Sequence, residues 1–278
     1  MARLSDRSPS PELRTPNVDA RGQVALVTGA ATGLGLAIAE AFGTAGARVA
    51  LNDLTAESLA TAHARLAALG VDCRGFPADV REARAVAAMI EAVTTELGTP
   101  DVVVASAGVY PNTPFLALSE AEWDRVVDTN LKGVFLTCQA AARAMVAAKK
   151  EGHLIVISSG AANTAFWGWS HYCASKAAAV MLTRAMALEL GEHGIRANAV
   201  LPGYVEVPEG GRHLDPGYRE AAARANPLGR AAEPADVASA VLLLASPLAG
   251  FVNGAALAVD GGSSAGRLGV YPAGRDGG

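Results

Sequence analysis

The sequence predicts a single α/β domain, a doubly wound parallel sheet of about seven strands with helices on both faces. Short apolar runs alternate with longer segments of helical periodicity from residue 23 onward. The apolar runs are continuous rather than alternating, which is typical of parallel strands buried on both faces. No internal repeat or mid-chain linker divides the 278 residues, and 51% of them are hydrophobic, so one large core is expected.

Apolar runs bounded by glycine, proline or polar residues predict the strands in order. The first run ends in glycines, the second ends at Asp53, and the last turns out through Asp260-Gly261-Gly262. The predicted strands cover residues 24–28, 48–51, 73–76, 102–105, 154–158, 195–201 and 256–259.

Helical periodicity and helix-end signals predict the helices between these strands. Gly70 and Gly98 stop the second and third helices, Ser119 to Glu122 has capping-box spacing, and Pro234 suits a first helical turn. The predicted helices cover residues 33–42, 55–69, 83–97, 131–149 and 170–190, with two further helices starting at 119 and 234.

Composition excludes several classes of function. The net charge is -4 and no basic run appears, so a nucleic-acid partner is not expected. The three cysteines are far apart, which favours a reducing cytoplasm over a disulfide framework, and the five histidines lack metal-ligand spacing. No apolar stretch reaches the roughly 18 residues of a membrane span. We expect a cytoplasmic protein without a metal site or membrane association, which acts on a small molecule.

The two ends differ from the rest of the chain. Residues 1–21 carry several prolines and no apolar signal-peptide core, so they are predicted to be a flexible leader. Residues 22–262 are predicted to be the cofactor-binding catalytic domain, and residues 263–278 a Gly-rich tail.

A glycine-rich turn follows the first predicted strand, in the order Thr28-Gly-Ala-Ala-Thr-Gly-Leu-Gly35. Glycines let the backbone turn sharply and approach a pyrophosphate, and the next helix points free N–H groups at that anion. Asp53, at the end of the second strand, can accept hydrogen bonds from ribose hydroxyls and would repel a 2′-phosphate. Leu54 follows it and no basic residue stands in the turn, so NAD is favoured over NADP.

Tyr172 and Lys176 lie at i, i+4 on a predicted helix and therefore share one face. An ammonium beside a phenol favours the phenolate, so we expect Lys176 to lower the pKa of Tyr172. Such a pair serves proton transfer near neutral pH. Ser159, at the carboxyl end of a strand, could hold a substrate oxygen near Tyr172. Ser158 is the alternative, and strand alternation lets only one of them point into the site.

These motifs, in this order, resemble the short-chain dehydrogenase/reductase family, a Rossmann fold, over residues 22 to 262. Asn130 matches the fourth member of its catalytic tetrad, beside Ser159, Tyr172 and Lys176. The resemblance implies that Tyr172 transfers a proton, Lys176 lowers its pKa and binds the nicotinamide ribose, and Ser159 positions the substrate oxygen. It implies that Asn130 holds a relay water. The cofactor-binding residues predicted from the turn, the acidic residue and the resemblance are Gly29, Thr32, Gly33, Leu34, Gly35, Asp53, Leu54, Asp79, Val80, Ser106, Ala107, Gly108, Tyr172, Lys176, Pro202, Gly203 and Val205.

Two positions depart from the family pattern. Ser106 stands where the family has an Asn after the fourth strand, so the central sheet is tied differently. Val207 replaces a Thr that often binds the carboxamide, leaving the backbone near Val205 for that contact. The predicted substrate loop runs from Tyr204 to Asn226.

The function expected is NAD(H)-dependent interconversion of a secondary alcohol, polyol or sugar-like compound and its ketone. An NADPH-dependent reductase of 3-oxoacyl thioesters is the alternative enzyme, and a non-catalytic cofactor-binding regulator is the alternative of another class. The resemblance implies a homotetramer, or a homodimer. His171 is expected to point away from the site. Four aromatic residues either line an apolar pocket or pack in the core or a subunit contact: Tyr110, Phe166, Trp167 and Trp169.

Overall fold

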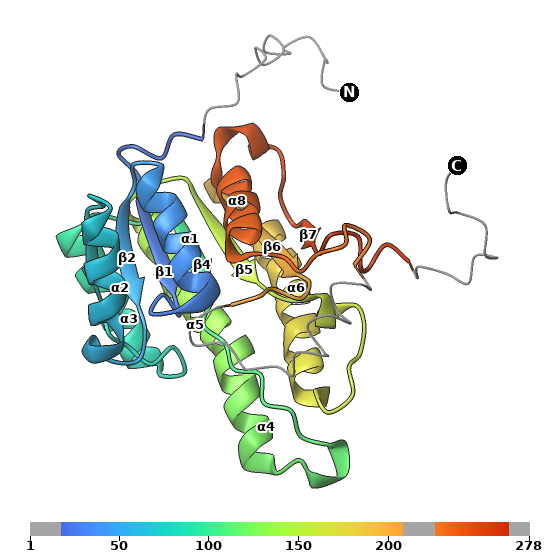
Figure 1. Cartoon of the computed structure of the whole chain (residues 1–278). Helices are drawn as coiled ribbons and strands as arrows, with labels where there is room; N and C mark the ends of the chain where they lie inside the picture. Colours follow the sequence, from blue (N-terminus) through green and yellow to red (C-terminus); the bar gives the residue numbers. More distant parts are fainter. Residues whose placement is uncertain (1–17, 208–225, 267–278) are drawn as a thin grey trace, which may run out of the picture.

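The computed structural model describes residues 18–207 and 226–266, which form a seven-stranded parallel sheet between two layers of helices (Figure 1). The strand order is β3-β2-β1-β4-β5-β6-β7, and each neighbouring pair is parallel. The predicted fold class is therefore confirmed. The direction of strand succession reverses between β1 and β4, and the crevice outside such a point is where ligands bind in doubly wound sheets.

The observed strands agree closely with those predicted from the apolar runs. β1 and β4 are buried along their whole length, because helices cover both faces of the sheet. The strands are β1 (Val24–Thr28), β2 (Arg48–Asn52), β3 (Cys73–Gly75), β4 (Val102–Ala105), β5 (Gly152–Ile157), β6 (Ile195–Pro202) and β7 (Ala256–Val259).

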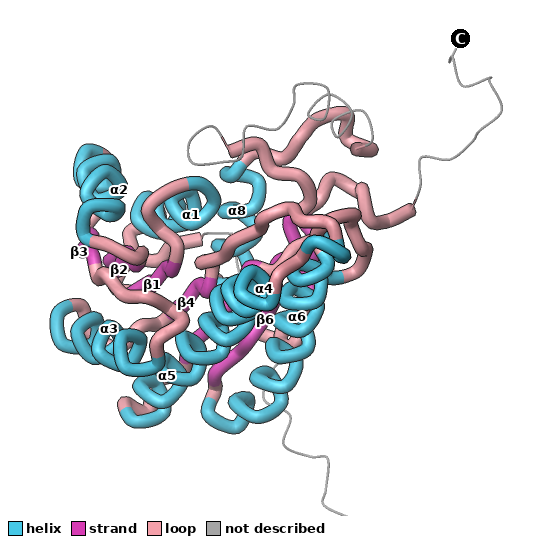
Figure 2. The backbone as a smooth tube through the Cα atoms, turned by 90° about the horizontal axis from the view of Figure 1, so that it is seen from below, coloured by secondary structure: helices cyan, strands magenta, loops and turns pink. Residues whose placement is uncertain are grey.

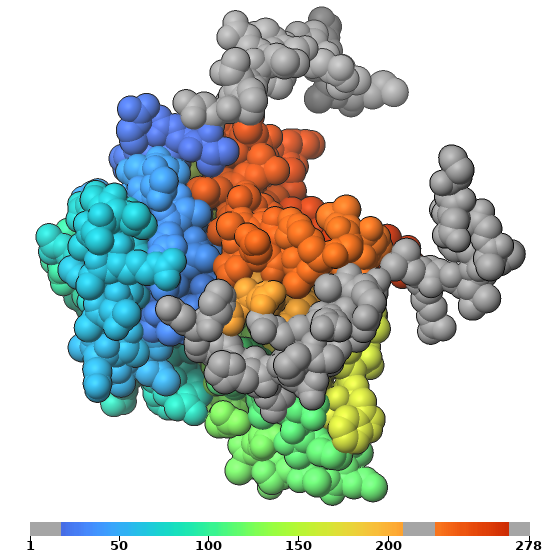
Figure 3. Space-filling model, viewed as in Figure 1, coloured from blue at the N-terminus to red at the C-terminus, as the bar shows by residue number. Residues whose placement is uncertain are grey.

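The helices divide into two layers, seen in Figure 2. One core lies under α1 (Gly33–Thr44), α2 (Ala56–Ala68) and α8 (Pro234–Ala245). The other lies under α3 (Ala83–Glu96), α5 (Gly133–Ala147) and α6 (Ser170–Leu190). Although they are far apart in sequence, α8 packs directly against α1, and the orange and blue parts of Figure 3 meet accordingly.

The region between β4 and α5 differs from its prediction. α4 (Glu120–Val127) continues into a π-helical turn, Asp128–Lys132, so α5 starts at Gly133 and the helix predicted for 131–149 is shorter. Ser119 caps α4 by accepting a hydrogen bond from the Glu122 N–H (3.2 Å). The Glu122 carboxylate is used elsewhere, so the predicted capping box forms in one direction only.

The described ranges include only parts of three predicted segments. Of the predicted leader, residues 18–21 are described, and Ala20 is buried with its N–H bonded to the Ala45 carbonyl (2.9 Å). Of the predicted tail, residues 263–266 are described. Most of the predicted substrate loop, residues 208–225, lies outside the described residues.

Candidate active site

The glycine-rich turn closes tightly between β1 and α1. Gly29 and Gly33 have φ values of +65° and +60°, which favour glycine. A Cβ on Gly29 would lie 2.8 Å from the Ala107 Cα, and one on Gly35 would overlap the Gly29 carbonyl oxygen. No side chain caps the first turn of α1 at Thr32, so its N–H groups remain for an anion.

The carboxylate of Asp53 is fixed beside this turn. One of its oxygens accepts a hydrogen bond from the Ala31 N–H (3.1 Å) and the other from the Leu54 N–H (2.8 Å). The pairing of β1 with β2 places Thr28 opposite Asn52, which brings the ends of the two strands level. Asp53 is therefore held at the edge where a ribose next to the bound phosphates would lie.

Asp79 and Val80 follow β3 at the same edge of the sheet. Arg81 donates to both carboxylate oxygens of Asp79, with Nε at 3.0 Å and Nη2 at 2.6 Å, and this pair lowers the pKa of Asp79. Val80 is buried, and a Cβ on Gly133 would meet its side chain at 2.8 Å. The segment of Asp79 and Val80 therefore packs closely against the start of α5.

Ser106, where the family pattern has Asn, is tied to β1 through its backbone. The N–H groups of Ser106 and Ala107 both donate to the Thr28 hydroxyl, at 3.0 and 3.1 Å. These bonds tie the end of β4 to the end of β1. Gly108 then passes close to the tetrad, since a Cβ there would lie 3.3 Å from Asn130 Oδ1 and 3.6 Å from Lys176 Nζ.

The structure brings Ser159, Tyr172 and Lys176 together. The interaction of Ser159 with the Tyr172 phenol acts to lower the pKa of Tyr172, and the Ser159 hydroxyl oxygen accepts a hydrogen bond from the Ala161 N–H (3.1 Å). Lys176 Nζ lies 5.7 Å from the centre of the Tyr172 ring and donates to the Ile157 carbonyl (2.8 Å). The alternative residue Ser158 is buried and donates to the Lys176 carbonyl instead (2.9 Å). Ser159 is therefore the serine that faces the phenol.

Asn130 lies in the π-helical turn, where its side chain is fully buried. Its Nδ2 donates to the Val109 carbonyl and its Oδ1 accepts from the Val109 N–H, both at 2.8 Å. A longer bond, 3.4 Å, reaches the Ser175 hydroxyl. The side chain thus fixes the segment that follows Gly108, and the relay water assigned to Asn130 stays a prediction.

The expected direction of the Tyr172 pKa is wrong in this structure. Burial raises the pKa of Tyr172, and the interaction with Ser159 offsets only part of this. Burial also lowers the pKa of Lys176 to about 8. Tyr172 and Lys176 do share one helix face, as predicted. However, the Lys176 ammonium donates to the Ile157 carbonyl, so the desolvation of Tyr172 outweighs the attraction between the ammonium and a phenolate.

The segment from Pro202 to Val207 leads from the end of β6 to the cofactor turn. A Cβ on Gly203 would meet the Asp260 Cβ at 2.8 Å, so the segment packs closely on the end of β7. Val205 forms a parallel bridge with Ala232. A Cβ on Gly33 would lie 3.3 Å from Val207 Cγ1, which puts the departure at Val207 directly over the start of α1.

A second network, which the sequence analysis missed, lies behind Tyr172. The carboxylate of Glu122 accepts a hydrogen bond from the Thr113 hydroxyl (2.5 Å) and lies 3.2 Å from His171 Nε2. His171 is fully buried and points away from the site, as predicted. The capping-box spacing drew attention to Glu122, but no sequence signal pairs it with Thr113.

The predicted residues fit a nicotinamide dinucleotide. The turn at Gly29 and Gly35 leaves a concavity that a Cβ would fill, the start of α1 offers N–H groups to phosphates, and Asp53 offers a carboxylate to a ribose. The tetrad lies at the same sheet edge, beyond Gly108. Over residues 18–207 and 226–266, no cluster of three or more His, Cys, Asp or Glu side chains is placed to hold a metal ion. No helix in those ranges is long and apolar enough to cross a membrane.

Comparisons with known proteins agree with this fold. The family model described as enoyl-(acyl carrier protein) reductase matches residues 29–264. D-threitol dehydrogenase of Mycolicibacterium smegmatis is 42% identical over 244 residues, 87% of this chain and 92% of that protein.

Two solved structures are similar over nearly the whole domain. A short-chain type dehydrogenase/reductase from Mycobacterium marinum is 37% identical, with a TM-score of 0.84 over 90% of this chain and 98% of that one. A gluconate 5-dehydrogenase from Burkholderia cenocepacia in complex with NADP and tartrate is 34% identical, with a TM-score of 0.85 over the same shares. This chain belongs to the short-chain dehydrogenase/reductase family.

Proposed function

We propose that this protein is an NAD(H)-dependent oxidoreductase that interconverts a secondary alcohol and its ketone, with Tyr172 as the acid/base. The observation that carries the proposal is the grouping of Ser159 with the Tyr172 phenol, with Lys176 Nζ 5.7 Å from the phenol ring. This group lies at the carboxyl edge of the sheet, next to the turn that fits a dinucleotide. A nicotinamide ring bound there supplies hydride transfer.

The side chains have distinct parts in the reaction. Ser159 donates a hydrogen bond to the substrate oxygen and holds it beside the Tyr172 hydroxyl. During oxidation Tyr172 takes the alcohol proton as the carbinol C–H bond breaks, and during reduction it returns a proton to the carbonyl oxygen. Lys176, when protonated, stabilises the phenolate that forms between these steps.

NAD is the proposed cofactor because of Asp53. Its carboxylate is held at the ribose edge by two backbone N–H groups, and a 2′-phosphate there would meet like charge. Arg81, the cation at this edge, is occupied by Asp79. The NADP-bound gluconate dehydrogenase shows that the family also uses the phosphorylated cofactor. The choice between NAD+ and NADP+ is therefore part of the experiment.

Assembly and location are proposed on the family resemblance. We expect a homotetramer, or a homodimer, in the cytoplasm. Apolar side chains exposed on the outer faces of α5 and α6 support such an assembly, namely Phe135, Met181 and Leu188. Light scattering of the purified protein measures the oligomeric state.

The experiment follows nicotinamide absorbance with NAD+ or NADP+ against secondary alcohols, polyols and 3-hydroxyacyl thioesters. Tyr172→Phe, which keeps the ring and loses the hydroxyl, is the control. NAD+-dependent turnover that this variant loses supports the proposal. Thioester turnover with NADP+ alone would favour the alternative, an NADPH-dependent reductase of 3-oxoacyl thioesters. NADH binding without turnover in either direction would favour a regulatory protein.

A further inference from the structure

Two aromatic rings lie beside the catalytic phenol. The Tyr110 ring lies edge-on to Tyr172, with centroids 6.3 Å apart and planes at 66°. The Trp169 ring lies 6.4 Å from Tyr172 at 57°, and Phe166 stands edge-on to Trp169 at 5.9 Å. Tyr110 follows β4, whereas Phe166 and Trp169 precede α6, so two separate segments supply what we call the aromatic wall (Tyr110, Phe166 and Trp169).

The two segments of the aromatic wall are bonded to each other. The Thr113 N–H donates to the Gly168 carbonyl (2.8 Å), and Asn112 Nδ2 donates to the Trp167 carbonyl (3.0 Å). Gly168 has φ +78°, and a Cβ there would overlap the Asn112 side chain. The hydrogen bond from Thr113 to Glu122 anchors the same segment to α4. The wall is therefore held in place before a substrate arrives, which lowers the entropic cost of binding.

The wall also presents apolar surface to the site. Tyr110, beside the half-buried Tyr172, and Phe166, which packs on Trp169, are each 44% exposed. Exposed aromatic surface lining a site next to a reacting group is typical of ligand pockets. A substrate that covers these rings gains from removing them from water.

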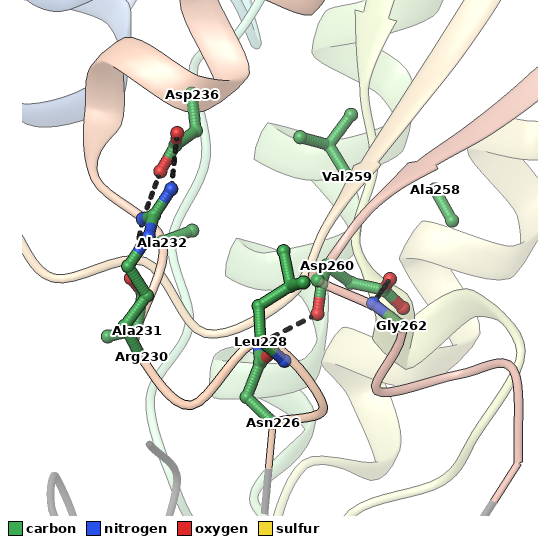
Figure 4. A pocket seen from close by; sticks show the side chains of 11 residues that line it. Asn226, Leu228, Arg230, Ala231, Ala232, Asp236, Ala258, Val259, Asp260 and Gly262 are labelled. Atoms are coloured by element: carbon green, nitrogen blue, oxygen red, sulfur yellow. Dashed lines mark hydrogen bonds and ion pairs between the residues drawn. The ribbon is translucent and has the colours of Figure 1, made fainter.

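Charge is sparse on the described segments that flank Tyr172. Residues 106–113, 159–172 and 202–207 contain no Lys or Arg, and their one carboxylate is Glu206. Lys176 is bonded to the Ile157 carbonyl. Arg230, in the neighbouring pocket of about 310 Å³ at the end of β7, is paired with Asp236 at 2.6 and 2.9 Å (Figure 4). Apart from the buried Lys176 ammonium, the described walls thus offer no unpaired cation to a carboxylate or phosphate.

We infer, on the basis of the proposed function, that the site takes an uncharged cyclic secondary alcohol or ketone whose apolar ring face lies against the aromatic wall. An open-chain polyol would bring several hydroxyls against rings whose polar groups are only the Tyr110 hydroxyl and the buried Trp169 indole N–H, and unpaired buried polar groups weaken binding. A sugar acid would in addition bring a charge without a partner. Ser159 and Tyr172 then engage the one reacting oxygen.

The test measures kcat/KM with NAD+ for cyclohexanol, threitol and gluconate. The wild-type value is expected to be about tenfold or more higher for cyclohexanol than for threitol, as expected when hydroxyls face an apolar pocket. Phe166→Ala and Tyr110→Ala should lower the cyclohexanol value about tenfold and change the threitol value less than about threefold. Phe166→Leu, which keeps an apolar side chain without the ring, should be intermediate. Phe115→Ala, at an exposed aromatic in the short helix before α4, is the control and should match wild type.

The outcomes separate this inference from the proposed function. If threitol or gluconate is the better substrate and Tyr172→Phe still abolishes turnover, the enzyme is a secondary-alcohol dehydrogenase but the inference is overturned. Equal losses on cyclohexanol and threitol in the Phe166 and Tyr110 variants, with unchanged melting temperatures, would also overturn it. If no alcohol is oxidised and no ketone reduced, both fall.

Discussion

The ammonium nitrogen of Lys176 lies 5.7 Å from the centre of the Tyr172 ring and is bonded to the main chain of β5, not to the phenol. Lys176 is 4% exposed, and its burial lowers its pKa to about 8. A lysine in this state keeps its proton at neutral pH and gives it up readily in mild alkali. The same low pKa means that the charge on Lys176 destabilises the folded protein relative to the unfolded chain.

Lys176→Met should remove a pH dependence of stability. The folded pKa, about 8, is below the ordinary value of 10.5, so between these values the unfolded chain binds more protons. Stability contributed at this site therefore rises with pH through that window, and the cost of the buried charge is fully present below pH 8. We expect wild type to gain relative to Lys176→Met from pH 7.5 to 9.5, measured by urea unfolding. A constant difference between the two proteins would contradict the assigned pKa.

Gly29→Ala should weaken dinucleotide binding more than it weakens the fold. Its Cβ would lie 2.8 Å from the Ala107 Cα, which forces apart the two loops that shape the cofactor turn. Gly70→Ala is the matched control, because Gly70 has a similar φ, +74°, and nothing lies within 4 Å of its Cβ position. Both variants bear the left-handed strain of about 1 kcal/mol. NADH titration by fluorescence should show at least tenfold weaker binding for Gly29→Ala alone.

Acid should destabilise the sheet through His153. This residue is buried on β5, where Asn198 Nδ2 donates to its Nε2 (2.9 Å). Protonation would replace that acceptor by a donor, and burial together with Arg196 lowers the pKa of His153 to about 3. The unfolded histidine takes a proton below pH 6.5, so stability is lost as pH falls, by up to roughly 1.4 kcal/mol per unit.

His153→Gln tests this origin of acid sensitivity. Glutamine can accept from Asn198 through Oε1 and does not titrate, so its unfolding free energy should depend less on pH between 6.5 and 4. Wild type and variant are compared by chemical denaturation at each pH. Parallel curves for the two proteins would show that another group carries the acid sensitivity.

Local spacing predicted most of the fold and the chemical groups of the site. The helix 170–190 was placed at its observed bounds, because its signals are all within the segment. Asp53 and Ser159 were found because each lies at the carboxyl end of a strand. The direction of the Tyr172 pKa was wrong, since it depends on burial by elements far away in sequence. Likewise, nothing in the sequence places Val207 over Gly33, a contact that arises only when the sheet assembles.

The network behind Tyr172 was also beyond local reasoning, and it yields the last prediction. Glu122 on α4 binds both Thr113, in the segment of Tyr110, and His171, the residue before Tyr172. Replacing it should loosen one side of the aromatic wall without touching the reacting atoms. Glu122→Gln should therefore raise KM for the alcohol about fivefold, corresponding to a coupling of about 1 kcal/mol, and leave kcat nearly unchanged.

Two further variants separate positioning from general damage. Thr113→Val breaks the same bond from the other side, so the double variant should raise KM little more than either single one. Glu120→Gln removes a carboxylate from the first turn of the same helix and should behave as wild type. A fall in kcat with unchanged KM in Glu122→Gln would mean that the network acts on Tyr172 through His171. In that case the carboxylate positions the phenol and not the substrate wall.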